Sequence, residues 1–365
     1  MKTVAVFFGG QSVEHDVSVI TGVLTVNSID KTKYAVIPVY VHNDGAWYTG
    51  EKLIDLDEYG KIDFKKLKRV TLVGGCNALY QVKGKKLKEL AKIRVAINCM
   101  HGERGEDGSL SGTLKMCGIA LASPSMLASS VCMDKEFTKV FLRGLKIKAL
   151  PSVTVKSVEE WAELSDKPQY PVIVKPACLG SSIGISVAKT EEEFVIALSY
   201  ALKFNERAVI EPCLTDFKEI NCAAYRGING IIKVSECERP VGRTEILSFG
   251  DKYESGKRVF PADIDKKISD KIKKTTEKVY SALGATGVIR IDYFIEKGEV
   301  YLNEINTVPG SLAYYLFGDT LKSFSGMLDE LIELADKNFI KELALNTLYQ
   351  SGILKGHGSK GVKRL

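Results

Sequence analysis

The stretch Val288-Ile-Arg-Ile-Asp-Tyr-Phe-Ile-Glu-Lys-Gly-Glu-Val-Tyr-Leu-Asn-Glu-Ile-Asn306 restricts the fold more than any other part of the sequence. It predicts two antiparallel strands on either side of the loop Glu296–Gly298. A three-residue hairpin loop with glycine at its third position is a favoured type. The register that follows from this loop places Arg290 opposite Glu304.

One face of this hairpin is predicted to be polar and the other apolar, because side chains alternate along a strand. The polar face carries Arg290, Asp292, Glu304 and Asn306. The apolar face carries Ile289, Ile291, Tyr293, Ile295, Tyr301 and Ile305. A two-residue loop would instead scatter the polar side chains over both faces, so the prediction depends on the turn.

The polar face has the composition of a metal and phosphate site. Two carboxylates and an amide offer hard oxygen ligands of the kind that Mg²⁺ prefers, and an arginine beside them could neutralise a phosphate or a developing oxyanion. The alternative is a solvated face with one cross-strand ion pair, worth under about 1 kcal/mol. The face ends in the turn Asn306-Thr-Val-Pro-Gly310 rather than in a run of surface charge, which favours the site.

A second segment, Tyr170-Pro-Val-Ile-Val-Lys-Pro-Ala-Cys-Leu-Gly-Ser-Ser-Ile-Gly-Ile-Ser186, combines a buried strand with a glycine loop. The strand delivers Lys175, and Pro176 ends its hydrogen-bond ladder. Backbone N–H groups of the loop Gly180–Gly184 could then cradle phosphate oxygens. The lysine precedes the glycines, so this is not the GxxxxGK[ST] loop. The alternative is a strand, a turn and a lysine that extends to solvent.

The first part of the chain alternates strands and helices with glycine loops at strand ends, the pattern of an open parallel sheet. The predicted elements are a strand at Val4–Phe8, a helix at Asp16–Ile29, and strands at Tyr34–Val41 and Val95–Met100. A turn-rich stretch, Gly118–Ser130, precedes a helix predicted from about Cys132 to Leu145. The glycine pair after the first strand lacks the GxGxxG spacing of a dinucleotide site.

Composition excludes several classes of protein. The 365 residues are 45% apolar and 26% charged, which fits two or three globular domains rather than disorder. No apolar run is long enough for a transmembrane helix or a signal peptide. The eight cysteines form no CxxC pair, so we expect a reduced, cytoplasmic protein. The net charge of +6 suits an anionic small molecule and is too weak and dispersed to argue for nucleic acid.

Taken together, these segments resemble the D-alanine–D-alanine ligases of the ATP-grasp superfamily. The resemblance runs in order from Val4 to about Leu316, through Gly-Gly-Gln-Ser-Val-Glu-His, His-Gly-Glu-Arg-Gly-Glu-Asp-Gly, Met-Asp-Lys, Val-Lys-Pro-x₃-Gly-Ser-Ser-Ile-Gly, Arg-Ile-Asp-Tyr-Phe and Asn-Glu-Ile-Asn-Thr-x-Pro-Gly. Their joint order is far more specific than any one of them.

The resemblance implies an α/β (α+β) chain with an N-terminal Rossmann-like domain and an ATP-grasp fold made of two further domains. The implied bounds are 1–122, 123–211 and 212–348, followed by a frayed tail at 349–365. It also implies a homodimer formed through the N-terminal domain, with no membrane or nucleic-acid partner.

The resemblance further assigns roles to single residues. Contacts to ATP would come from Lys135, Lys175, Ser182, Glu211, Cys213, Leu214, Glu219 and Lys252. Two Mg²⁺ or Mn²⁺ ions would be held by Asp292, Glu304 and Asn306. Catalysis would involve a hydrogen-bonded triad of Glu14, Ser181 and Tyr253, with Arg290 and the Gly310 N–H at the tetrahedral oxyanion. Substrate would be bound by Glu14, His101, Ser311 and Leu312.

The implied reaction joins two D-alanines through an acyl phosphate to make D-alanyl-D-alanine for peptidoglycan. Two alternatives stay open at this stage. After Gly310 the chain reads Ser-Leu-Ala-Tyr-Tyr-Leu-Phe, whereas most members have a longer Met-Thr-x-His-Ser-Leu segment that shapes the acceptor pocket. The acceptor could therefore be D-serine or another D-amino acid. The chain could also be a regulator that binds a nucleotide without turnover.

Overall fold

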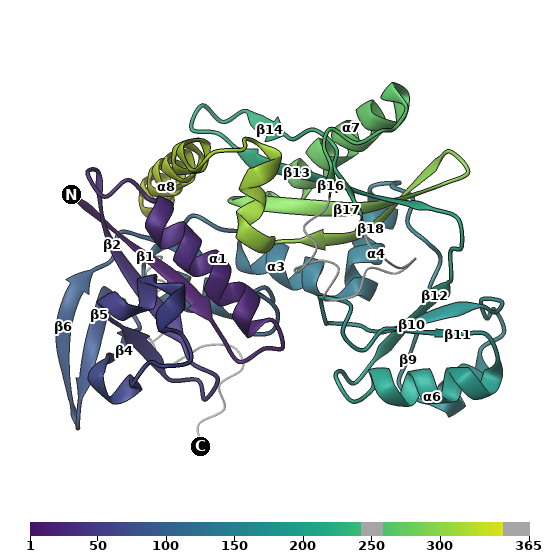
Figure 1. Ribbon diagram of the computed structural model, residues 1–365, viewed down its shortest axis with the longest axis horizontal. Coiled ribbons are helices and arrows are strands. Elements are labelled where there is room, and N and C mark those ends of the chain that lie inside the picture. The colour runs from purple at the N-terminus through teal and green to yellow at the C-terminus, as the bar shows by residue number, and fades with distance from the viewer. Residues whose placement is uncertain (242–257, 346–365) are drawn as a thin grey trace, which may run out of the picture.

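The computed structural model describes residues 1–241 and 258–345. Lys252, Tyr253 and the predicted tail at 349–365 therefore lie outside the described residues. Three sheets follow one another along the chain (Figure 1), and each is built from a consecutive stretch of sequence. The predicted domain boundaries at 122 and 211 stay predictions.

The first sheet has eight strands in the order β6-β5-β4-β3-β2-β1-β7-β8. Its parallel part consists of β1 (Lys2–Gly9), β2 (Tyr34–Val41), β7 (Val95–Asn98) and β8 (Ala120–Leu121). The expectation of an open parallel sheet holds for this part only. Antiparallel strands extend it, namely β3 (Trp47–Thr49), β4 (Lys68–Val73), β5 (Cys76–Lys83) and the lysine-rich edge strand β6 (Lys86–Lys92).

Helices and short 3₁₀ turns accompany this sheet. The helices are α1 (His15–Ser28) and α2 (Ser109–Met116), and the 3₁₀ turns are η1 (Glu51–Ile54), η2 (Leu56–Glu58) and η3 (Phe64–Lys66). Helix α1 begins directly after the glycine loop that ends β1, as predicted, and its apolar residues pack on Phe8. Glu14 thus stands at the junction of strand and helix.

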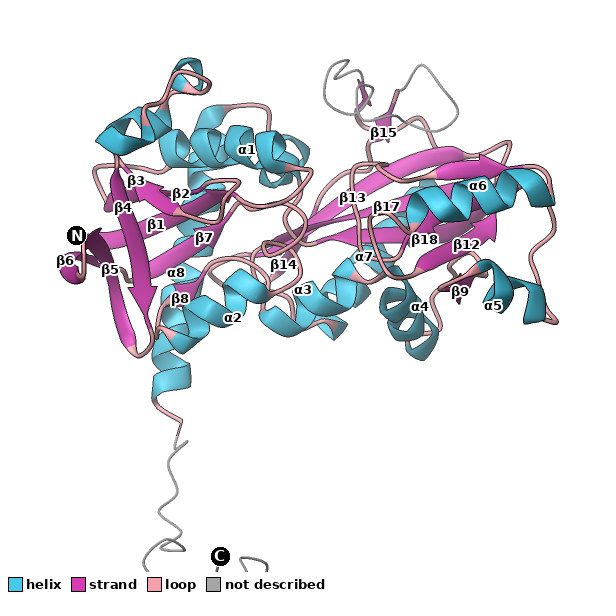
Figure 2. Ribbon diagram, turned by 90° about the horizontal axis from the view of Figure 1, so that it is seen from below, coloured by secondary structure: helices cyan, strands magenta, loops and turns pink. Residues whose placement is uncertain are grey.

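The second sheet is antiparallel, with strand order β11-β10-β12-β9. Its strands are β9 (Val153–Val155), β10 (Val172–Pro176), β11 (Ser186–Ala188) and β12 (Ala208–Pro212). Helices α5 (Val158–Glu163) and α6 (Glu191–Ala201) cover it (Figure 2). Trp161 stacks on Phe194 in the core of this part of the chain. The opposite face of this sheet is left for the site described below.

The third sheet, β14-β13-β17-β18, contains the hairpin that opened the sequence analysis. Its strands are β13 (Lys218–Arg226), β14 (Ile232–Val234), β17 (Val288–Glu296) and β18 (Glu299–Asn306). Helix α7 (Lys266–Ala282) packs on its apolar face, and a two-stranded sheet of β15 (Arg239–Pro240) and β16 (Arg258–Val259) lies beside it.

The hairpin register differs from the prediction. Lys297 and Gly298, with φ of 49° and 80°, form a two-residue turn, and Arg290 pairs with Asn306 instead of Glu304. A β-bulge next to Asp292 then shifts the register by one residue. Because of this bulge the polar face survives the shorter turn. Tyr301 was wrongly predicted to be in the core: it is half-buried, while its neighbours Val300 and Leu302 are buried.

The prediction of a single helix from Cys132 to Leu145 is also wrong. Part of the stretch before it, which was predicted to consist of turns, is helical. The chain forms α3 (Met126–Met133) and α4 (Lys135–Gly144), separated by Asp134. Asp134 is extended, and its carboxylate accepts the N–H groups of Glu136 and Phe137 at 2.9 and 3.1 Å. A capping aspartate therefore ends one helix and starts the next.

The last described helix, α8 (Leu321–Leu343), returns to the first sheet (Figure 1). Its apolar residues share a core with α1, β1 and β7, and Phe324 stacks on Tyr314 of the 3₁₀ segment η5 (Gly310–Leu316). The segment that follows β18 is thus enclosed between the first and third sheets. No helix within residues 1–241 and 258–345 is long and apolar enough to cross a membrane.

Candidate active site

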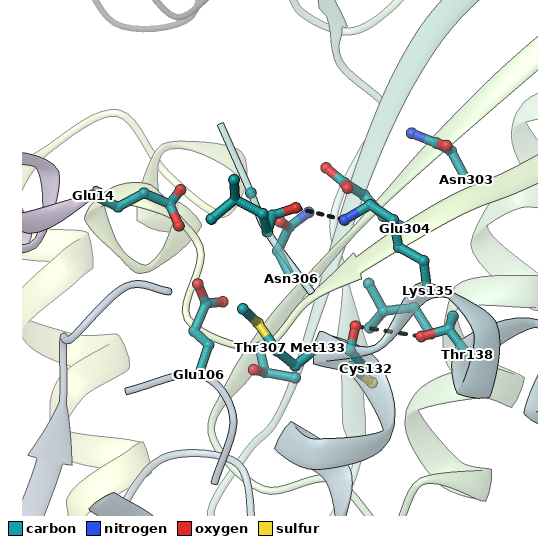
Figure 3. Close-up of a pocket in the computed structure, with 13 residues that line it drawn as sticks. Glu14, Glu106, Cys132, Met133, Lys135, Thr138, Asn303, Glu304, Asn306 and Thr307 are labelled. Atoms are coloured by element: carbon teal, nitrogen blue, oxygen red, sulfur yellow. Dashed lines mark hydrogen bonds between the residues drawn. The ribbon is translucent and has the colours of Figure 1, made fainter. Parts of the chain in front are cut away.

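Two adjoining pockets lie where the three sheets meet. The first pocket, with about 460 Å³ of empty space, is lined among others by Glu14, Glu106, Glu304 and Asn306 (Figure 3). The second, with about 750 Å³, is lined by Lys175, Ser182, Glu211, Leu214 and Glu219 together with apolar residues. Both include Lys135, Leu179, Gly180, Asn303 and Glu304. They therefore form one continuous site that contains many of the predicted residues.

A buried ion-pair cluster centres on Glu211, at the end of β12. Its carboxylate contacts the Lys139 Nζ at 2.5 Å and the Lys175 Nζ at 2.6 Å. Burial alone would raise the pKa of Glu211, but the two ammonium groups hold it below its usual value. The Glu211 carboxylate is thus ionised and forms an ion pair with each of the two lysines.

Lys139 was missed by the sequence reasoning. It lies on α4, four residues after Lys135 and on the same side of the helix, so the spacing was a usable signal. Its Nζ also donates to the Leu150 carbonyl at 2.6 Å. Lys135 donates to the Leu179 carbonyl at 2.6 Å, which directs it to the loop after β10. Burial lowers the pKa of both lysines.

Replacing Lys139 with methionine should destabilise the fold by about 1–3 kcal/mol, the scale of a hydrogen bond to a buried charge. Lys175 still partners Glu211, so the loss stays below that of an orphaned charge. The lowered pKa of Glu211 means that its pairing stabilises the fold above the usual carboxyl pKa and is lost as the pH falls through the lowered value.

Lys139→Met should raise the folded-state pKa of Glu211, so that acid unfolding begins at a higher pH than in the wild type. Urea unfolding at neutral pH and in acid checks both expectations. Lys148→Met, which removes an exposed ion pair with Glu299, is the control and should change little. Equal acid profiles for wild type and Lys139→Met would contradict the role given to Lys139.

The polar face of the third sheet lies next to the two pockets: Glu304 lines both of them, and Asn306 lines the first. Arg290 grips Asp292 with two bonds, Nε to Oδ1 at 2.7 Å and Nη2 to Oδ2 at 2.9 Å. The Asn306 Nδ2 donates to the same Oδ2 at 3.0 Å, which turns its amide nitrogen toward Asp292. Three of the predicted residues are therefore brought together, and Glu304 stands beside them on β18.

The donor set of this face fits a hard divalent cation only in part. Two carboxylates and an amide suit Mg²⁺, which binds one or two carboxylates and takes further oxygens from phosphates. Within the described ranges, no group of three or more His, Cys, Asp or Glu forms a complete metal cage.

Asn303 is a second residue that the sequence reasoning missed. It occupies the bulge of β18, next to Glu304, and so lines both pockets. The Lys175 Nζ lies 3.5 Å from its Oδ1. The strand pattern alone gives no signal for it, because a regular strand would direct residue 303 to the opposite face from 304.

Glu14 and Ser181 meet on the other side of the first pocket. The Ser181 hydroxyl donates to a Glu14 carboxylate oxygen, across 167 residues of sequence. Ser181 and Ser182 both have left-handed backbones, with φ of 54° and 59°. A Cβ on Gly180 would lie 2.9 Å from each Glu14 carboxylate oxygen, so any larger residue there would displace this carboxylate. The glycine loop thus packs closely against the Glu14 carboxylate.

His101 and Glu106 lie on the same side of the site as Glu14. Burial, with Arg290 adding to it, lowers the pKa of His101 to about 3, so its imidazole is neutral. Glu106 accepts the N–H groups of Gly102 and Val308 at 3.0 and 2.9 Å. Burial and then the neighbouring Glu14 raise the pKa of Glu106 to about 8. Glu106 lies within the sequence motif His101–Gly108, but the sequence alone did not indicate a role for it.

The remaining predicted residues border these groups. Cys213 lies between pocket residues and donates its N–H to the Pro171 carbonyl at 2.9 Å. Gly310 opens η5, and Ser311 and Leu312 follow it with left-handed backbones. The Ser311 N–H is 3.0 Å from the Thr21 Oγ1.

Comparison with known proteins explains this arrangement. Family models described as "D-ala D-ala ligase N-terminus" and "D-ala D-ala ligase C-terminus" match residues 3–124 and 146–333. A D-alanine–D-alanine ligase from Thermosipho melanesiensis is 35% identical over 353 residues, which cover 93% of this chain and 95% of that protein. The chain belongs to the D-alanine–D-alanine ligase family. D-alanine–D-alanine ligase A of Escherichia coli (strain K12) is 31% identical, with 94% of this chain and 98% of that protein covered.

Solved structures of the family agree. A D-alanine–D-alanine ligase from Helicobacter pylori has a TM-score of 0.76 at 29% identity, and 91% of this chain and 98% of that one are covered. The VanG D-Ala:D-Ser ligase from Enterococcus faecalis has a TM-score of 0.78, also at 29% identity, with coverage of 92% and 99%. As a member of this family, the chain is an ATP-dependent, ADP-forming ligase, and the predicted ATP-grasp fold is confirmed.

Proposed function

We propose that this family member joins two D-alanines to make D-alanyl-D-alanine for peptidoglycan. One observation carries the proposal: a single pocket is lined both by Asn306, which bonds Asp292, and by Glu14, which accepts a hydrogen bond from Ser181. A carboxylate is a poor electrophile, so the first D-alanine must be activated as an acyl phosphate. Groups that stabilise phosphoryl transfer and a carboxylate that can bind an ammonium must therefore face each other, as they do here.

The second pocket is proposed to bind ATP. Its apolar wall, which includes Ile173, Phe217 and Phe294, suits a flat base. Phosphates would be contacted by Lys135, Lys175, Ser182 and Lys252, and the base and ribose by Glu211, Cys213, Leu214 and Glu219. Lys175 is paired with Glu211 in this structure, and Lys139 would keep Glu211 neutralised when Lys175 turns to a phosphate.

Asp292, Glu304 and Asn306 are proposed to hold two Mg²⁺ or Mn²⁺ ions with the nucleotide. Such ions would neutralise the phosphate charge that otherwise repels the D-alanine carboxylate. Hydrogen bonds orient the Asp292 carboxylate oxygens: the Arg290 guanidinium donates to both of them, and the Asn306 amide donates to one.

Glu14 and the neutral His101 are proposed to bind the first D-alanine, with Ser181 and Tyr253 completing the triad. The amine of the second amino acid then attacks the acyl phosphate. Arg290 and the Gly310 N–H would stabilise the oxyanion of the tetrahedral intermediate. Ser311 and Leu312 are proposed to contact the acceptor.

A D-serine acceptor is the second candidate. It is favoured by the match to the D-Ala:D-Ser ligase, which equals the match to the Helicobacter pylori enzyme in sequence identity. The segment after Gly310, which is proposed to shape the acceptor side, also departs from the usual family sequence. We further propose a cytoplasmic homodimer, which light scattering on the purified chain tests.

The function is tested by ADP release with a panel of D-amino acids, combined with mass spectrometry of the products. We expect ADP and D-alanyl-D-alanine from D-alanine alone, and a mixed dipeptide when D-serine competes as acceptor only if the second candidate is correct. L-alanine is the control and should give neither product. ATP binding without ADP release across the whole panel would favour the regulatory alternative and contradict the proposal.

A further inference from the structure

The turn that carries Gly310 is strained and needs support from outside. It leaves β18 at Asn306, and Gly310 is followed by Ser311, Leu312 and Ala313 with φ of 51°, 49° and 49°. Three consecutive non-glycine residues in the left-handed region are unfavourable, and such a conformation persists only when its surroundings fix it.

Two side chains from the first part of the chain, one partly and one fully buried, bond this turn on either side of Gly310. Glu106 accepts the Val308 N–H at 2.9 Å. Thr21, which is 1% exposed on α1, accepts the Ser311 N–H at 3.0 Å through its Oγ1. Gly310 lies between these two anchors. The backbone on either side of Gly310 is therefore held by residues about 200 and 290 positions away in sequence.

The same threonine hydroxyl reaches the substrate side of the site. The Thr21 Oγ1 lies 3.1 Å from the His101 Nε2. Because the hydroxyl already accepts from Ser311, its single hydrogen is available for Nε2. The other ring nitrogen, Nδ1, lies on the side of Glu106, whose Oε2 is 3.9 Å away. One hydroxyl thus links the histidine proposed to face the first substrate with the turn proposed to stabilise the oxyanion.

We propose that Thr21 is a positioning residue for the ligation step. Its hydroxyl holds the Gly310–Ser311 peptide and the His101 ring in one arrangement, so that the Gly310 N–H points at the oxyanion. The inference rests on the proposed ligase function. It predicts that loss of the hydroxyl impairs stabilisation of the tetrahedral intermediate while ATP binding is unchanged, because Thr21 is not part of the nucleotide pocket.

The test compares Thr21→Val, which removes only the hydroxyl at nearly constant shape, with Thr25→Val on the same helix. Thr25 is equally buried, and its hydroxyl donates to the Thr21 carbonyl at 2.7 Å without touching the turn. The probe is a phosphinate analogue of the dipeptide, whose tetrahedral P–O⁻ group takes the place of the oxyanion. Thr21→Val should lower kcat and the phosphinate affinity by about tenfold or more, since a displaced oxyanion donor costs somewhat less than a deleted one.

The KM for ATP should stay unchanged in Thr21→Val, and Thr25→Val should behave as wild type in all three measurements. Thr21→Ala against Thr21→Ser, which differ only in the hydroxyl, repeats the comparison if valine unfolds the chain, and Thr21→Ser should restore kcat. Equal kcat and phosphinate affinity in Thr21→Val and Thr25→Val would overturn the inference. A wild-type chain that makes no dipeptide would instead contradict the proposed function.

Discussion

Glu304→Gln should lose ADP release by about 100-fold or more while its melting temperature stays that of the wild type. Glutamine keeps the size and one oxygen of the side chain but removes the charge that a divalent cation needs, and metal stabilisation of phosphoryl transfer is worth several kcal/mol. The fold should tolerate the change because Glu304 is half-buried in a polar pocket on a paired strand. ADP release over a range of Mg²⁺ concentrations checks it.

Glu299→Gln is the matched control, since it makes the same change on the same strand. Glu299 lies at the exposed end of β18, where it pairs with Lys148 on the surface. It should release ADP like the wild type. Normal turnover of Glu304→Gln at limiting Mg²⁺ would show that Glu304 is not a metal ligand.

The sequence predicted the elements well wherever the signal was local. Strand β2 was predicted with its observed bounds, and β1 and α1 within one or two residues, because alternation, apolar periodicity and the glycine pair act over a few positions. The composition of the polar face was also predicted, since Arg290, Asp292 and Asn306 are in mutual contact. The reason given for it, a three-residue loop, was wrong.

Features set by packing could not be predicted in this way. The bulge in β18 directs both Asn303 and Glu304 into the site, while Val300 and Leu302 of the same strand belong to the core of the third sheet. The Thr21 hydroxyl contacts residues 80 and 290 positions away in sequence. A threonine inside a predicted helix does not indicate such partners. Long-range partners of this kind are decided by the tertiary structure.

Arg290→Lys should lower kcat by about 30- to 1000-fold, which corresponds to about 2–4 kcal/mol of transition-state stabilisation. The substitution keeps the charge, so any loss comes from geometry. The guanidinium donates to Asp292 through its Nε and Nη2 at 2.7 and 2.9 Å, and a fork of fixed shape can bond both carboxylate oxygens at once. A lysine ammonium is a point charge that cannot hold both Asp292 oxygens in this way.

Arg290→Lys also separates two roles of the residue. If Arg290 only neutralised phosphate, the lysine variant would keep the affinity for ATP and the rate of ADP release. If it also fixes Asp292 and faces the oxyanion, dipeptide formation should fall much more than ATP affinity. Arg226→Lys, which changes a half-buried arginine of β13 that bonds the Gly230 carbonyl away from both pockets, is the control and should leave kcat unchanged. A kcat near that of the wild type would mean that charge alone suffices at this position, and the oxyanion role would have to pass to the Gly310 N–H and its two anchors, Glu106 and Thr21.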